Sequence, residues 1–143
     1  MATTVRDILK SKGNKVDGIG PEATVLDALK MMAELNIGAL VVMDGDKLAG
    51  IISERDYARK IVLKGRTSLD TSVRDIMSSR VICATLDQTA EECLAIMTAK
   101  AIRHLPVLEQ KRVVGLISIG DLVKAIIANQ SFVIEQLASY IQG

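Results

Sequence analysis

Gly50-Ile51-Ile52-Ser53-Glu54-Arg55-Asp56 is a stretch that the chain repeats as Gly115-Leu116-Ile117-Ser118-Ile119-Gly120-Asp121. In each copy an apolar, strand-like run ends in a serine, an aspartate follows three residues later, and a helical pattern begins. Two interpretations of this strand-to-helix turn are open. Ser-x-x-Asp is a capping box that satisfies the first backbone N–H groups of a helix. It also lies at a helix N-terminus, which suits an anion such as phosphate.

The repetition extends well beyond this turn. When Gly50 is placed on Gly115, residues 24–62 align with residues 89–127 without a gap. Outside this gapless alignment, the lead-in segments at 5–8 and 73–76 also resemble each other. The identical pairs include Thr24/Thr89, Leu29/Leu94, Met32/Met97, Ile37/Ile102, Leu40/Leu105, Val42/Val107 and Ile61/Ile126. Self-similarity at a fixed period indicates a tandem repeat. We assign the first repeat to residues 1–65 and the second, with a C-terminal helical tail, to residues 66–143.

Each repeat has a pattern typical of β-α-β-β-α structure. The predicted strands are 16–19, 39–43 and 48–52 in the first repeat, and 81–84, 105–108 and 113–117 in the second. Helices are predicted to begin at the N-caps Thr24 and Thr89, and again at 56–63 and 121–128. A single repeat of about 60 residues buries too little surface to be stable alone. The fold class is therefore α/β (α+β), with the two repeats expected to pack about a pseudo-twofold axis.

Two segments fall outside the repeat. Residues 63–72 are polar and are predicted to link the two copies. Residues 131–143 have no counterpart in the first repeat, and Val133, Ile134, Leu137 and Ile141 recur there at helical spacing. This apolar stripe is predicted to cover the module or to join a second chain.

Composition excludes several classes of function. The chain has 143 residues, 49% hydrophobic and 24% charged, which is typical of a globular protein. Its net charge of +1 gives no basic face for nucleic acid. No apolar run approaches the roughly 18 residues that span a bilayer, and the N-terminus lacks a secretory hydrophobic segment. We therefore expect no membrane or nucleic-acid partner and a cytoplasmic location.

The sequence offers no catalytic constellation. His104 is the only histidine, the two serines of the repeated turn have no evident base, and no phosphate-binding loop of the Walker type is present. Cys83 and Cys93 are not in a C-x-x-C unit and are predicted to be buried thiols. We therefore expect neither an enzyme nor a metal site.

The doubled G-h-x-S-x-x-D turn (h, apolar), together with the β-α-β-β-α pattern, resembles a CBS-domain pair, or Bateman module. The strings SERDYARK (53–60), IRHLPV (102–107) and GLISIGDLVK (115–124) resemble bacterial stand-alone pairs. The resemblance implies a regulatory module that binds an adenosine-containing ligand (AMP, ADP, ATP, NAD or S-adenosylmethionine) in the cleft between the repeats. It implies no catalytic cofactor, and it leaves the protein target unknown. We expect a homodimer, because an open pair exposes apolar helix faces.

The resemblance also implies roles for individual residues. In that family the aspartate of the turn binds the ribose hydroxyls and the serine lies near the phosphates; the matching residues are Asp121 and Ser118, and Asp56 and Ser53. Adenine is implied to lie against the first strand of a repeat. The other implied site residues are Arg103 toward phosphate, with His104, Thr85 and Ile82. A guanidinium suits phosphate because its donors match two oxygens at once.

The two copies differ at the companion positions. Where the second repeat has Arg103-His104 and Thr85, the first has Gly38-Ala39 and Gly20. We therefore expect the better site at Asp121 and a less certain one at Asp56. The alternative function is a ligand-free dimerisation or scaffold module in which both turns are only helix caps.

Overall fold

The computed structural model describes the backbone of residues 2–142, and all their side chains except those of residues 132, 133, 140 and 142. The predicted tail position Val133 therefore lies outside the described side chains, and Gly143 outside the described backbone. By contacts the chain forms two compact units. Unit 1 comprises Met1–Lys15 and Cys83–Gly143, and unit 2 comprises Val16–Ile82. The lead-in segment of the first repeat (5–8) thus lies in unit 1 with the hairpin of the second repeat. The lead-in segment of the second repeat (73–76) lies in unit 2 with the hairpin of the first. Packing about a pseudo-twofold axis stays a prediction.

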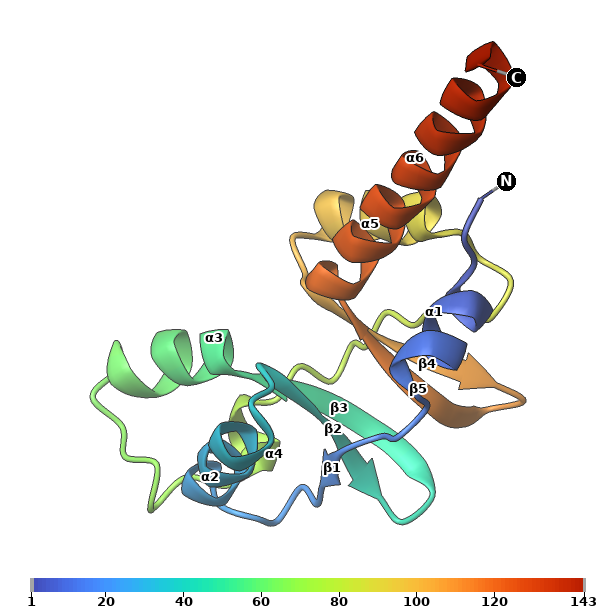
Figure 1. Cartoon of the computed structure of the whole chain (residues 1–143). Coiled ribbons are helices and arrows are strands. Elements are labelled where there is room, and N and C mark those ends of the chain that lie inside the picture. The colour runs from blue at the N-terminus through green and yellow to red at the C-terminus, as the bar shows by residue number, and fades with distance from the viewer. Residues whose placement is uncertain (1, 143) are drawn as a thin grey trace. The chain divides into compact units, whose positions relative to one another are not determined.

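Unit 2 is a three-stranded sheet with helices (Figure 1). Its strands are β1 (Gly18–Ile19), β2 (Ala39–Asp44) and β3 (Lys47–Ser53), with β1 parallel and β3 antiparallel to β2. Its helices are α2 (Val25–Leu35), α3 (Glu54–Tyr57), which continues as the π-helical turn η1 (Ala58–Val62), and α4 (Val73–Ile76). One aliphatic core joins these helices to the sheet, through buried side chains such as Met32, Leu40, Ile52, Ile61 and Ile76, and Tyr57 of α3 packs against it.

Unit 1 contains a two-stranded antiparallel sheet with helices (Figure 1). The sheet consists of β4 (His104–Glu109) and β5 (Arg112–Ser118). The helices are α1 (Val5–Lys12), α5 (Ala90–Lys100) and α6 (Ile119–Gln142). The predicted helix at 121–128 and the predicted tail form the single helix α6. Its 24 residues make it about 36 Å long.

The predicted strand at 81–84 is reduced to one parallel bridge between Ala84 and Val107. The Ala84 N–H donates to the Pro106 carbonyl at 2.8 Å, and its carbonyl accepts from the Leu108 N–H at 3.0 Å. Pro106 has no N–H with which to continue the ladder toward residue 82. In unit 2 the corresponding Val41 N–H donates to the Asp17 carbonyl at 3.4 Å. The proline therefore accounts for the shorter pairing.

The local signals for caps and turns are confirmed. The Thr24 hydroxyl accepts from the Asp27 N–H at 3.1 Å, and the Thr89 hydroxyl accepts from the Glu92 N–H at 3.1 Å. The predicted linker 63–72 is not a free connection, because the Val25 N–H donates to the Thr71 carbonyl at 2.9 Å. Thr71 is also buried. The linker therefore closes the N-terminal end of α2.

The repeated glycine lies where a lead-in segment crosses a hairpin. A Cβ atom on Gly50 would lie 2.7 Å from the Ser78 carbonyl oxygen and 2.8 Å from the Met77 sulfur. A Cβ atom on Gly115 would lie 2.7 Å from a methyl carbon of Leu9. In unit 2 the crossing is fixed by paired hydrogen bonds of 3.0 and 2.9 Å between Ile51 and Ser78. Backbone packing therefore requires glycine at position 50, whereas at position 115 a larger residue would displace the Leu9 side chain.

Gly50→Ala is expected to lower the free energy of unfolding by about 2 kcal/mol, as overpacking does in other proteins, because the new methyl group meets backbone at Ser78. Gly115→Ala is expected to cost less, since the Leu9 side chain can change rotamer. Urea denaturation of each variant measures the change in the free energy of unfolding. Gly20→Ala is the matched control, because nothing lies within 4 Å of its Cβ position. Equal stability of the Gly50 and Gly20 variants would contradict the packing argument.

Candidate functional site

The turn at the end of β5 holds Ser118 and Asp121 in a reciprocal capping arrangement. The Ser118 N–H donates to Asp121 Oδ2 at 2.9 Å, and the Asp121 N–H donates to Ser118 Oγ at 3.2 Å. Ser118 and Asp121 therefore form the predicted capping box. The hydrogen bonds to this carboxylate from described residues all end on Oδ2, which leaves Oδ1 able to accept from another group.

Lys12 reaches the same carboxylate from the end of α1. Its Nζ donates to Asp121 Oδ2 at 2.6 Å and to the Leu116 carbonyl at 2.7 Å. Sequence reasoning missed this residue. The signal that could have found it is helical spacing, because Val5, Ile8, Leu9 and Lys12 share one face of α1. Leu9 on that face packs over Gly115, so Lys12 follows it toward the turn.

The predicted pair Arg103-His104 lies beside this turn. His104 is opposite Ser118 in the register of β4 and β5, and the Ile119 N–H donates to the Arg103 carbonyl at 2.9 Å. Burial lowers the pKa of His104, and the positive charges of Lys12 and Arg103 lower it further while Asp121 opposes them. These four side chains therefore act on one another electrostatically, with His104 favoured in its neutral form.

The charge of Asp121 is stabilised at this turn. Burial by itself would raise the pKa of Asp121, but hydrogen bonds from Lys12 and from the Ser118 backbone outweigh burial and lower that pKa overall. A carboxylate that stays ionised is a strong hydrogen-bond acceptor. The turn therefore presents a fixed anion next to the cations Lys12 and Arg103.

The first copy has the same capping but a different environment. The Ser53 N–H and Oγ donate to Asp56 Oδ2 at 2.9 and 3.0 Å. Asp56 Oδ1 is bound by Lys60 at 3.2 Å, and Lys60 also donates to the Ile76 carbonyl at 2.8 Å. Lys60 is four residues beyond Asp56, a spacing that sequence alone could have identified as an ion pair. Both oxygens of this carboxylate are therefore occupied.

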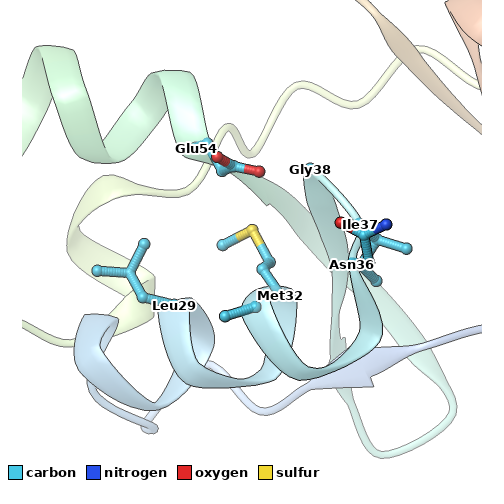
Figure 2. A pocket seen from close by; sticks show the side chains of 7 residues that line it. Leu29, Met32, Asn36, Ile37, Gly38 and Glu54 are labelled. Carbon is cyan, nitrogen blue, oxygen red and sulfur yellow. The ribbon is translucent and has the colours of Figure 1, made fainter.

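In the first copy, Gly38, the position that corresponds to Arg103, lines a pocket. A cavity of about 350 Å³ lies between α2 and the start of α3. Figure 2 shows Met32 pointing into it from α2, with Glu54 across from it and Gly38 at its edge. Gly38 corresponds to Arg103 of the second copy. The pocket lining contains an acid and no cation, so no side-chain charge in it favours a phosphate.

Two predicted residues are not brought to the Asp121 turn within unit 1. Ala84 pairs with Val107, whereas Ser118 pairs with His104. Three residues of β4 separate these positions, which is about 10 Å at 3.3 Å per residue. Thr85 follows Ala84 and lies farther toward the hairpin tip, where its N–H donates to Gln88 at 2.9 Å. Ile82 belongs to unit 2.

Comparison with known proteins identifies the family. The model of the CBS domain matches residues 5–63 and again 73–128. The CBS domain-containing protein CBSX3, mitochondrial, of Arabidopsis thaliana is 42% identical over 99% of this chain and 73% of its own length. The chain therefore belongs to the CBS-domain family and carries two copies of the domain. The fold class and the tandem repeat predicted from sequence are confirmed.

Solved structures agree with this assignment. A protein with CBS domains from Burkholderia ambifaria is 50% identical and superposes with a TM-score of 0.86, covering 90% of this chain and 96% of that one. The CBS domain pair of protein MJ0100, in complex with 5-methylthioadenosine and S-adenosyl-L-methionine, is 26% identical with a TM-score of 0.80, covering 90% and 99%. No helix among residues 2–142 has the length and apolarity needed to cross a membrane.

Lys12→Met is expected to raise the pKa of Asp121, because it removes the hydrogen bond and the positive charge that lower this pKa. The lowered pKa contributes stability above the unfolded value of about 3.9, and this stability is lost as the pH falls through the folded pKa. In the variant, protonation of Asp121 at acid pH should therefore cost less of the free energy of unfolding than in the unmodified protein. Carboxyl ¹³C NMR titration measures the pKa. Lys10→Met, at an exposed position of the same helix, is the control. An unchanged Asp121 pKa in Lys12→Met would contradict the ion pair.

Proposed function

We propose that the chain is a regulatory sensor module that binds an adenosine-containing ligand at the Asp121 turn and signals by a change in packing. The observation that carries this proposal is the Asp121 carboxylate. It is ionised, fixed by Ser118 and Lys12, and has Oδ1 left to accept hydrogen bonds. A carboxylate in this state can accept from the two hydroxyls of a ribose. The MJ0100 pair with its two adenosine ligands supports the choice of ligand class.

The charges around the turn favour a ligand that carries phosphate. Lys12 and Arg103 are cations, and His104 becomes one on protonation, whereas Asp121 is the acid of this group. A nucleotide would place its ribose at Asp121 and its phosphate toward Arg103 and His104. Arg103 is exposed, so its guanidinium can turn toward a phosphate without leaving a buried position. AMP, ADP, ATP and NAD therefore suit the site better than an uncharged nucleoside.

The Asp56 turn and the Asp121 turn are proposed to have different roles. At Asp56 both carboxylate oxygens are engaged, and the positions that correspond to Arg103 and His104 are Gly38 and Ala39. A ligand at that turn would have to displace Lys60 and would meet no cation at those two positions. Ser53 and Asp56 are therefore assigned chiefly to capping α3, and Ser118 and Asp121 to both capping and binding.

The proposal extends to a regulatory role without catalysis and to a homodimer. A ligand changes a conformational equilibrium only through its different affinities for the two states. Binding must therefore alter packing near the Asp121 turn for a partner to detect it. Helix α6 begins at this turn and extends beyond α5 (Figure 1), so it is the element through which such a change would be transmitted.

The test is ligand-dependent thermal stability. AMP, ADP, ATP or NAD at 100 times its dissociation constant should stabilise the protein by about 2.7 kcal/mol, seen as a rise of several degrees in Tm. Asp121→Asn should remove most of that rise, because an amide keeps the shape but loses the charge. Asp56→Asn is the matched control and should keep most of the rise. Adenosine without phosphate should give a smaller rise.

The alternative function is a scaffold whose turns are helix caps only. In that case Asp121→Asn and Asp56→Asn would each reduce stability by about 1 kcal/mol, as loss of a cap does. None of the nucleotides would change the Tm of the unmodified protein. A rise that is equal in both variants would place the ligand elsewhere and overturn the proposed site.

A further inference from the structure

One face of the first half of α6 packs against other elements of unit 1. Leu122 is fully buried, and Ala125, Ile126 and Asn129 are partly buried, at the spacing of one helical face. This face packs against α5. Among the side chains that the structure describes, Asn129 is its last partly buried member, and the helix continues to Gln142.

A second apolar face of α6 is exposed along the whole helix. It begins at Val123, the residue after Leu122. The helix itself extends beyond α5 (Figure 1). Its members, called the α6 stripe below, are Val123 (41% exposed), Ile127 (57%), Gln130 (exposed), Ile134 (66%), Leu137 (58%) and Ile141 (81%).

The α6 stripe follows a heptad repeat. The steps between its members alternate between four and three residues, which is the spacing of positions a and d in a coiled coil. Ile127, Ile134 and Ile141 fall at position a, and Val123, Gln130 and Leu137 fall at position d. A helix that packs on a globular core needs only the 3.6-residue spacing. The strict heptad indicates another helix as the partner.

We propose that the α6 stripe binds the α6 stripe of a second copy of the chain as a parallel, two-stranded coiled coil. Isoleucine at position a with leucine at position d favours two parallel strands. In this register Gln130 meets Gln130 of the other copy, and their side-chain amides can donate to and accept from each other. A polar residue at a single core position fixes register. The inference rests on the proposed homodimer and not on the proposed ligand.

The charges along this segment suit a second copy better than other occupants. Within the span of the α6 stripe, 123–141, the charged residues are Lys124 at heptad position e and Glu135 at position b, and neither lies at a core position a or d. Two identical helices therefore meet without like charges in register. A lipid surface is disfavoured, because membrane-binding helices are rich in Lys and Arg on their polar face, whereas Lys124 is the single basic residue between 123 and 141.

Sedimentation equilibrium of the full chain tests the proposal. The unmodified protein should be a dimer that dissociates on dilution, because the stripe spans fewer than the three or four heptads of a strong coiled coil. Ile134→Asp should be monomeric over the same concentrations. It should keep its far-ultraviolet spectrum, since Ile134 is exposed in the single chain. Ser139→Asp is the matched control. This exposed position lies on the opposite side of the helix, at heptad position f, and the variant should remain a dimer.

Cross-linking distinguishes the orientation. Gln130→Cys should form an interchain disulfide under mild oxidation, because parallel strands in register place the two residues together. Ser139→Cys and the unmodified chain, with its own Cys83 and Cys93, provide the background. A dimer that survives Ile134→Asp would overturn the coiled coil while leaving the homodimer in place. A protein that is monomeric at every concentration would overturn both. Neither result changes the expected effect of nucleotides on Tm.

Discussion

The crossing of each lead-in segment over a hairpin glycine is the contact on which the rest of the structure depends. At Gly50 the crossing chain forms backbone hydrogen bonds with Ile51, and at Gly115 the helix α1 lays Leu9 directly on the glycine. A side chain on Gly50 would push the crossing backbone at Ser78 away from the sheet, and one on Gly115 would displace the Leu9 side chain. Both units are closed in this way, and each is closed by a segment that lies in the other repeat along the sequence.

The two crossings also explain why the duplicated turns differ. In unit 2 the Ile51 carbonyl is satisfied by the Ser78 N–H. In unit 1 the corresponding carbonyl, that of Leu116, is satisfied by the side chain of Lys12, whose ammonium group simultaneously reaches Asp121. The donor to this carbonyl is thus a backbone N–H in unit 2 and a charged ammonium group in unit 1. Because the donor in unit 1 is the Lys12 side chain, a positive charge lies next to Asp121.

Features that depend on neighbouring residues could be predicted from the sequence, and features that depend on distant ones could not. The caps at Thr24 and Thr89 and both hairpins follow from local patterns. The shortened pairing at Ala84 depends on Pro106, which is far along the chain. Lys12 was missed because its partner is more than a hundred residues away. Thr85 carried a suitable hydroxyl, but strand direction places it away from Asp121.

The exchange of lead-in segments makes the two units unequal during synthesis. Unit 2 is one continuous stretch, so every residue of it has been made once the chain reaches Ile82. Unit 1 is interrupted by the whole of unit 2, and α1 is made before any residue of unit 2. The apolar face of α1, with Val5, Ile8 and Leu9, therefore has no sheet of its own to cover until β4 and β5 have left the ribosome. Folding of unit 1 is accordingly tied to synthesis of β4 and β5, whereas folding of unit 2 is not.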